Sequence, residues 1–258
     1  MTASPDTITR SCSDITTTAC RAGSRGRPAG LAVLRRSGRA GGSGPQAAPT
    51  APVDEDTHRP YVCRGLVPDP IPYALRSDYF CGDWRLGPKK LPTRGLVANT
   101  LDHYQRLGSL TATQFLNRWW DPAADTGQGD WRYPDADGYA KDPQGQPIAT
   151  ELVLHAGQKV DRFGNEAGRY LAPAGTKYGK RSIPPSSLNT ADPRHPYNYY
   201  LYRVTRDVTV CAGPIAPAFE QPGLGVQYVT SSSYCPKIPR TSVLDLVRNG
   251  TLERLTTS

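Results

Sequence analysis

The stretch Tyr199-Tyr200-Leu201-Tyr202-Arg203-Val204 carries the strongest structural signal in this sequence. Aromatic and β-branched residues dominate it, and residues of this kind favour β-strands. Val208–Cys211 follows closely and has the same character, so it is expected to form a second strand. Together the two segments indicate that this part of the chain forms a β-sheet.

Two further segments extend the predicted sheet in both directions along the chain. Glu151–His155 precedes the first pair of strands, and Val226–Thr230 follows it. The tight turn Pro222-Gly223-Leu224-Gly225 leads into the latter, because Gly and Pro mark turns between periodic segments. The chain is therefore β-rich from about residue 150 onward.

Two helices are predicted from their caps. Ser242 and Asp245 have the spacing of a capping box at the start of a short C-terminal helix, which Gly250 ends. Thr111 caps a second helix through Gln114–Trp120. The apolar residues expected on the inner faces of these helices are Phe115, Leu116, Trp119, Trp120, Leu244, Leu246 and Val247.

The composition divides the chain into three parts. Residues 1–58 are rich in Ser, Thr, Gly, Ala, Pro and Arg and are expected to be a disordered tail or linker. Residues 61–148 form a helical and loop portion, in which 121–145 is expected to be loop, and 149–258 form the β-rich domain. The predicted fold class is α+β, with a small, strongly bent, mixed or antiparallel sheet.

The charge is concentrated at the N-terminal end. Of the net charge of +8, residues 1–50 contribute +5, from seven Arg, no Lys and two Asp. Because nucleic-acid binding needs a basic folded surface, no nucleic-acid partner is expected. No apolar run approaches the roughly 20 residues of a membrane span.

The cysteines favour an oxidising compartment. Those in the part expected to fold are Cys63, Cys81, Cys211 and Cys235. Four cysteines allow three connectivities, and nearness in sequence favours Cys63–Cys81 and Cys211–Cys235; the alternative is free buried thiols. The sequon Asn249-Gly250-Thr251 agrees with secretion. Residues 1–20 lack the apolar segment of a signal peptide. Either secretion is unconventional or the natural start lies elsewhere, and we expect the latter.

Two segments are candidates for chemistry. Val160–Gly164, together with Gly168–Pro173, places Asp161 and Arg162 beside glycines that let a ligand approach the backbone. Residues 215–228 place Gln227 inside an apolar alternation, where a buried amide needs partners. The alternative is a surface Arg162 in a salt bridge and a Gln227 that faces solvent. No G-x-S-x-G elbow, phosphate loop or dinucleotide-fold fingerprint is present.

Four strings in these segments carry a family resemblance: D-R-F-G at 161–164, G-R-Y-L-A-P at 168–173, R-S-I-P-P at 181–185 and E-Q-P-G-x-G-x-Q-Y at 220–228. In order and spacing they resemble the tuberculosis-necrotizing-toxin family of NAD glycohydrolases, and within it the surface NADases that fungi secrete. The resemblance covers about residues 150–255 and extends more loosely to 77–83.

The resemblance implies roles for single residues. Arg162 and Gln227 match the essential arginine and glutamine of the family, and Tyr170 matches a supporting tyrosine. Tyr197 or a neighbouring residue occupies the position where some toxin members have a histidine, as in the fungal members. Further substrate-binding candidates are Phe163, as a stacking partner for nicotinamide or a core residue, and Glu220, as a support for the cationic sugar or a surface residue.

The implied activity is hydrolysis of NAD or NADP to nicotinamide and ADP-ribose (ADP-ribose 2′-phosphate from NADP), at the cell surface or in secretion, with NAD as substrate and no cofactor. The family raises a calcium site in a C-terminal extension, which we do not expect because the chain ends at Ser258. The resemblance also suggests a homodimer and a protein inhibitor, but the sequence does not show whether this chain has either. The alternatives are an ADP-ribosyltransferase, whose R-S-E or H-Y-E patterns are absent, and a non-catalytic secreted binding module.

Overall fold

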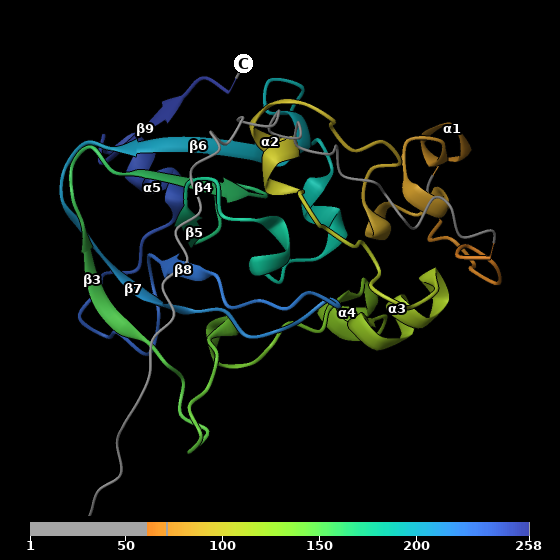
Figure 1. Cartoon of the computed structure of the whole chain (residues 1–258), viewed down its shortest axis with the longest axis horizontal. Coiled ribbons are helices and arrows are strands. Elements are labelled where there is room, and N and C mark those ends of the chain that lie inside the picture. Colours follow the sequence, from red (N-terminus) through yellow and green to blue (C-terminus); the bar gives the residue numbers. More distant parts are fainter. Residues whose placement is uncertain (1–60, 71, 258) are drawn as a thin grey trace, which may run out of the picture. The chain divides into compact units, whose positions relative to one another are not determined.

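The computed structural model describes residues 61–70 and 72–257. The predicted tail, residues 1–58, lies outside this part of the chain. The described part is built on a seven-stranded sheet with the strand order β3-β7-β8-β5-β4-β6-β9 (Figure 1). Each pair of neighbouring strands in it is antiparallel. The predicted α+β class with an antiparallel sheet is therefore confirmed.

The predicted strands are all present. Tyr199–Val204 is β6, with the bounds that its sequence predicts. The other three predicted strands are β3, β7 and β8, whose ends agree with the prediction to within three residues. Strands β4, β5 and β9 have no counterpart among the predictions. The remaining bounds are β3 Thr150–Leu154, β4 Lys159–Phe163, β5 Tyr170–Pro173, β7 Val208–Pro214, β8 Val226–Val229 and β9 Leu252–Leu255.

Both predicted helices begin at their predicted caps. Thr111 and Gln114 form a capping box at the start of α3 (Ala112–Trp119), and Ser242 and Asp245 form one at α5 (Val243–Arg248). The other helices are α1 Tyr73–Arg76, α2 Gly95–Thr100 and α4 Ala124–Gly127, with 3-10 turns at Phe80–Gly82, Trp84–Leu86, Ala136–Gly138, Tyr178–Lys180, Pro185–Leu188 and Pro196–Asn198. In Figure 1, α1, α3 and α4 lie beyond one end of the large sheet.

The expectation of a loop over residues 121–145 is wrong at its start. Trp120–Asp121 (β1) and Asp130–Trp131 (β2) pair antiparallel on either side of α4. Trp120 and Trp131 are buried, and their rings meet edge to face with centroids 5.1 Å apart. Burial of these two large rings stabilises a hairpin that the surrounding Asp and Gly residues conceal in the sequence.

Two disulfides are present, Cys63–Cys81 and Cys211–Cys235, which is the pairing that nearness in sequence favours. The first lies in the N-terminal portion, before the sheet in the sequence, and its Cys81 packs against the aromatic core of that portion. The second joins β7 to the segment after β8, and both of its cysteines are buried. None of the helices in the described part is long and apolar enough to cross a membrane.

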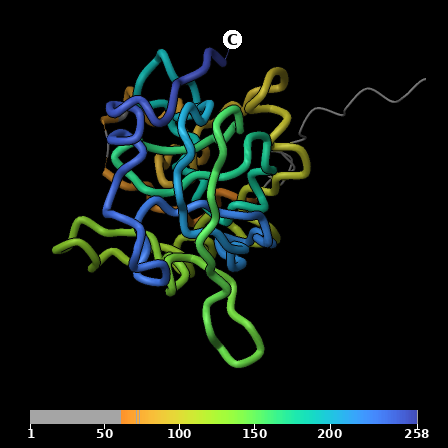
Figure 2. Tube along the Cα trace, turned by 90° about the vertical axis from the view of Figure 1, so that its left-hand side faces the viewer, coloured from red at the N-terminus to blue at the C-terminus, as the bar shows by residue number. Residues whose placement is uncertain are grey.

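The large sheet is covered on one side by α5. Val243 and Leu246 of this helix pack in one apolar cluster with β-strand residues that include Tyr202 and Val210. At one edge of the sheet, β3 runs beside β7, and the segment that leads into β3 projects away from the rest (Figure 2). Residues of β4, β5 and β8, together with residues 133–138, line a cavity that forms the site.

Candidate active site

A cavity of about 520 Å³ lies between the sheet and the segments that flank it. Three neighbouring strands, β4, β5 and β8, supply one part of its wall, and residues 133–138 and 181–184 supply most of the rest. The volume lies within the range of about 300–1,000 Å³ usual for small-molecule sites. The two separate segments selected from the sequence therefore meet here, because Arg162 and Gln227 both line this cavity.

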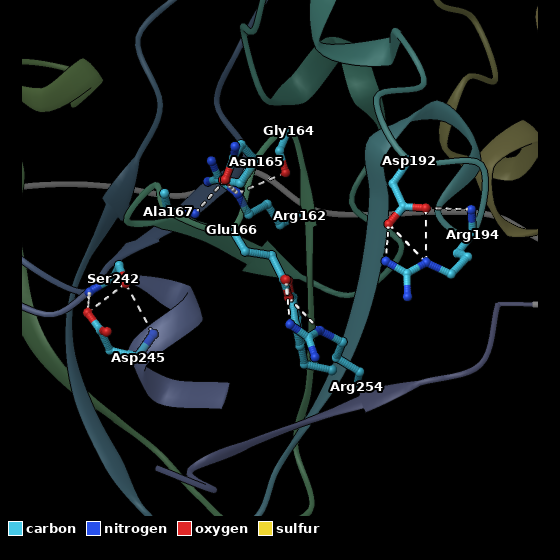
Figure 3. A network of polar contacts seen from close by, with 11 residues as sticks. Arg162, Gly164, Asn165, Glu166, Ala167, Asp192, Arg194, Ser242, Asp245 and Arg254 are labelled. Carbon is cyan, nitrogen blue, oxygen red and sulfur yellow. Dashed lines mark hydrogen bonds and ion pairs between the residues drawn. The ribbon is translucent and has the colours of Figure 1, made fainter. Parts of the chain in front are cut away.

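Arg162 is held by backbone oxygens. Its Nε donates to the carbonyls of Asn165 at 2.7 Å and Gly164 at 3.3 Å, and its Nη1 donates to the carbonyl of Tyr170 at 2.8 Å. Figure 3 shows the guanidinium against the loop that follows β4. A Cβ on Gly168, in the G-R-Y-L-A-P string, would overlap Nη2, so a side chain there would require the guanidinium to move. The guanidinium is thus fixed in one position at the cavity wall.

The charge of Arg162 has no carboxylate partner within the described part of the chain. Burial lowers the pKa of this guanidinium from its ordinary value, but an arginine still remains cationic at neutral pH. Three of its five N–H groups are free of protein acceptors in the same part of the chain. A half-buried cation with spare donors on a cavity wall is a site for an anionic ligand.

Asp161 neutralises a different arginine. Its carboxylate is fully buried and pairs with Arg181 Nη2 at 2.7 Å. Tyr199 Oη and the N–H of Gly175 also donate to it, at 2.9 and 2.8 Å. The aspartate and the arginine of the D-R-F-G string therefore have separate tasks: Asp161 satisfies Arg181, from the R-S-I-P-P string, and leaves Arg162 unpaired.

The two aromatic candidates differ in exposure. Phe163 is 6% exposed and packs against Tyr178 and Tyr199, with ring centroids 5.1 and 4.9 Å away, so its ring belongs mainly to the core. Tyr170 is 36% exposed and lies at the cavity, with the guanidinium of Arg169 5.5 Å from its ring centroid. Tyr170 is therefore the better placed of the two to stack on a ligand.

Gln227 is buried, 6% exposed, and does not face bulk solvent. Its Nε2 donates to the backbone carbonyl of Asp137 at 2.9 Å. A carbonyl oxygen can only accept, and the NH2 group is the only donor of the glutamine amide, so this bond fixes the orientation of the amide. Gln227 Oε1 has no hydrogen-bond partner in the described part of the chain and is the acceptor that the side chain can offer to a ligand.

Asp137 is the site residue that sequence reasoning missed. It lines the cavity, and its carboxylate accepts from Arg169 Nη2 and from Ser232 Oγ, each at 2.8 Å. The sequence shows it as one of several aspartates in a segment rich in Asp, Gly and Pro. Its Asp-Gly dipeptide indicates a turn, but nothing local separates it from its neighbours.

Two sequence candidates do not line the cavity. The carboxylate of Glu220 accepts from Trp119 Nε1 at 3.1 Å and pairs with Arg118 at 3.0 Å, so it serves the contact with α3. Tyr197 lies in the 3-10 turn Pro196–Asn198, packed against the aromatic cluster around Phe163. Nearness to Gln227 in the chain is thus no guide to nearness in space for Glu220, because a tight turn separates the two residues.

The site does not have the features of a metal centre in the described part of the chain. Within residues 61–70 and 72–257, no three His, Cys, Asp or Glu side chains are grouped to bind a metal ion. His195 stacks on Tyr200, with ring centroids 4.2 Å apart, and does not line the cavity. The polar side chains that line the cavity include the guanidinium of Arg162, the amide of Gln227 and the carboxylate of Asp137.

A cavity with one unpaired cation, one amide acceptor and an exposed aromatic ring defines a site for an anionic ligand that carries a ring. Residues 153–255 match the family model described as "Tuberculosis necrotizing toxin". The chain is 46% identical over 190 residues to the conidial surface nicotinamide adenine dinucleotide glycohydrolase nadA of Aspergillus fumigatus. The aligned region covers 73% of this chain and 76% of that protein. This chain therefore belongs to the tuberculosis-necrotizing-toxin family.

The matches among solved structures are more distant. Tuberculosis necrotizing toxin in complex with its immunity factor IFT matches with a TM-score of 0.43 and 21% identity, over 57% of this chain and 75% of that chain. Rhs1-CT in complex with its cognate immunity protein RhsI1 matches with a TM-score of 0.24 and 16% identity, over 42% of this chain and 76% of that chain.

Proposed function

We propose that this protein is an NAD(P) glycohydrolase that cleaves the nicotinamide–ribose bond at the cavity of Arg162 and Gln227. The unpaired guanidinium of Arg162 carries the proposal, because NAD presents a pyrophosphate to such a cation. The kinship with a conidial surface NAD glycohydrolase supports the substrate and a place at the cell surface. The two disulfides agree with that place, since disulfides persist in oxidising compartments.

The reaction needs no acid to release its leaving group. Nicotinamide is attached to the ribose as a pyridinium; when the C–N bond breaks, the electron pair moves to the ring nitrogen and nicotinamide leaves neutral. Water then adds to the cationic ribose carbon and releases one proton to solvent, which gives ADP-ribose. Ordinary glycoside hydrolysis differs, because a carboxylic acid must protonate the leaving oxygen. The lack of a cavity histidine is thus no objection.

The wall residues divide the remaining work. Arg162 binds the pyrophosphate with the N–H groups that the loop carbonyls leave free. Tyr170 stacks on a ring of the substrate at the open side. Gln227 Oε1 accepts a hydrogen bond from a ribose hydroxyl, the attacking water or the nicotinamide amide. Residues 149–258 form the catalytic portion, and residues 133–138 complete its wall.

Incubation of the purified protein with NAD, followed by separation of the products, tests the proposal. Nicotinamide and free ADP-ribose are expected. ADP-ribose attached to protein would indicate a transferase, and intact NAD would indicate a binding module. Arg162→Lys keeps the charge but loses the planar fork, so its KM for NAD should rise by about tenfold or more. Arg194→Lys is the matched control, since Arg194 is exposed and pairs with Asp192.

A further inference from the structure

Two carboxylates line the cavity, and they differ in what they can reach. The side chain of Asp161 is fully buried, and Arg181, Tyr199 and the N–H of Gly175 surround it. The side chain of Asp137 is 16% exposed. Of these two wall carboxylates, Asp137 is the one that a ligand in the cavity can contact.

The carboxylate of Asp137 is held in place by two donors from the sheet side. Arg169 Nη2 donates to Oδ1 and Ser232 Oγ donates to Oδ2, each at 2.8 Å. A carboxylate offers about four lone-pair sites, so two bonds leave it able to accept more. Asp137 is therefore oriented by the protein without being saturated by it.

The backbone at Asp137 is strained. Its φ is +53°, and Ala136 before it has a φ of +54°. Residues other than Gly rarely adopt this left-handed backbone region, and such strain persists where contacts with the surroundings hold the conformation in place. Here the contact partner is Gln227, whose amide binds the carbonyl of Asp137. The strained turn thus places a carboxylate and the amide acceptor on the same part of the wall.

From this geometry we infer that Asp137 is a catalytic carboxylate of the proposed hydrolysis, facing the ribose carbon that becomes cationic. The inference rests on the proposed function. While the C–N electron pair moves to nicotinamide, positive charge develops on the ribose carbon and its ring oxygen. A fixed carboxylate beside that charge stabilises it without reorganisation, and a partly buried site strengthens the interaction. Water then takes the place of nicotinamide at the same carbon.

This role belongs to a segment outside the part of the chain that matches the family model, which begins at residue 153. It also replaces Glu220, the carboxylate that lies nearest to Gln227 in the sequence and that pairs with Arg118 instead. The cavity consequently needs Asp137 for its chemistry, while Tyr133, Pro134 and Gly138 from the same segment contribute to its wall and Asp135 does not line it.

The test uses Asp137→Asn in the full chain, compared with Asp135→Asn. Asp135 is two residues away and exposed, and it pairs with Lys141, which makes it the matched control. Kinetics with NAD should show kcat reduced about 100-fold in D137N with KM changed by less than about threefold, and normal kinetics in D135N. NAD should still bind D137N in calorimetry, because Arg162 and Tyr170 remain; a merely structural defect would lower binding as well.

The outcomes distinguish a failure of the proposed function from a failure of the role of Asp137. A wild-type protein that leaves NAD intact overturns the proposed function and the role of Asp137 together. A wild-type protein that cleaves NAD, with a folded D137N that does so at a similar kcat, overturns the role of Asp137 alone. Should D137N fail to fold, Asp137→Glu keeps the charge and displaces it; a kcat at least tenfold lower supports the role, and a wild-type kcat overturns it.

Discussion

Gln227 donates a hydrogen bond to the backbone carbonyl of Asp137 across 90 residues of sequence, with Nε2 and the oxygen 2.9 Å apart. This bond joins β8 to the turn ahead of the sheet and leaves the acceptor oxygen of the amide for a ligand. It is a direct link between the β-rich domain and residues 61–148. The same bond makes the contribution of Gln227 measurable, because a second buried glutamine offers a comparison.

Gln227→Ala should lower kcat/KM for NAD by at least 30-fold, equivalent to about 2 kcal/mol of transition-state stabilisation. Gln221→Ala is the control: Gln221 is also buried and donates to the backbone carbonyls of Gln105 and Phe219, but it does not line the cavity. Each variant should lose about 1 kcal/mol of stability for its hydrogen bond. Steady-state kinetics on folded protein decides, and near-normal cleavage by Q227A would refute the assignment.

The pH dependence of stability should report on Glu166. This buried residue lies in the loop that holds Arg162, and Arg254 binds its carboxylate through Nε at 2.8 Å and Nη2 at 2.6 Å (Figure 3). Burial raises the pKa of Glu166, but the hydrogen bonds from Arg254 and Tyr202 outweigh it and lower the pKa below 4.5. A lowered folded-state pKa means that the stabilisation is complete above the ordinary value and is lost as pH falls through the folded value.

Glu166→Gln should therefore flatten the loss of stability below pH 4.5, measured as the free energy of unfolding in urea at a series of pH values. Glu253→Gln is the control, because Glu253 makes an exposed pair with Arg203 and exposed pairs contribute little. The idea fails if E166Q and the wild type lose stability in parallel on acidification.

Local signals allowed part of this structure to be predicted. The caps Thr111 and Ser242 act on donors within their own first turn, so a sequence shows them directly. The aromatic alternation of Tyr199–Val204 likewise needs no partner to be recognised. Strand β4 was missed because it carries Asp161 and Arg162, whose burial depends on Arg181 and on carbonyls beyond the strand.

The site residues show the same difference between features that the sequence reveals and contacts that it does not. The residue pattern and the family strings both point to Arg162 and Gln227, and both residues line one cavity. Asp137 escaped selection because its partners, Arg169, Ser232 and Gln227, lie 32 to 95 residues further along the chain. Glu220 was selected for its place near Gln227 in the sequence, yet its carboxylate binds α3. Polar contacts between residues far apart in the chain leave no periodic pattern, so they cannot be predicted from the sequence alone.

The turn before β8 should tolerate no side chain at Gly223. Its φ is +66°, and a Cβ would lie 2.8 Å from the carbonyl oxygen of Ile215 and 2.9 Å from that of Ala216. Gly145 is the matched control, because its φ is +80° but a Cβ there would meet open space. Gly145→Ala should cost about 1–2 kcal/mol for the left-handed backbone alone. Gly223→Ala should cost about 1–3 kcal/mol more from overlap; equal urea midpoints for the two variants would contradict this.

The disulfide Cys211–Cys235 should support activity as well as stability. It closes a chain segment with a sequence separation of 24 that contains all of β8 and therefore Gln227. Loop-closure entropy gives it roughly 3 kcal/mol, and Cys63–Cys81, with a separation of 18, a similar amount. Replacing either pair by alanine should lower the free energy of unfolding to a similar degree. Under conditions where both variants are folded, only the C211A/C235A protein should lose NAD cleavage, because only that bridge anchors the strand that bears Gln227. Equal activities of the two variants would show that β8 is held without its disulfide.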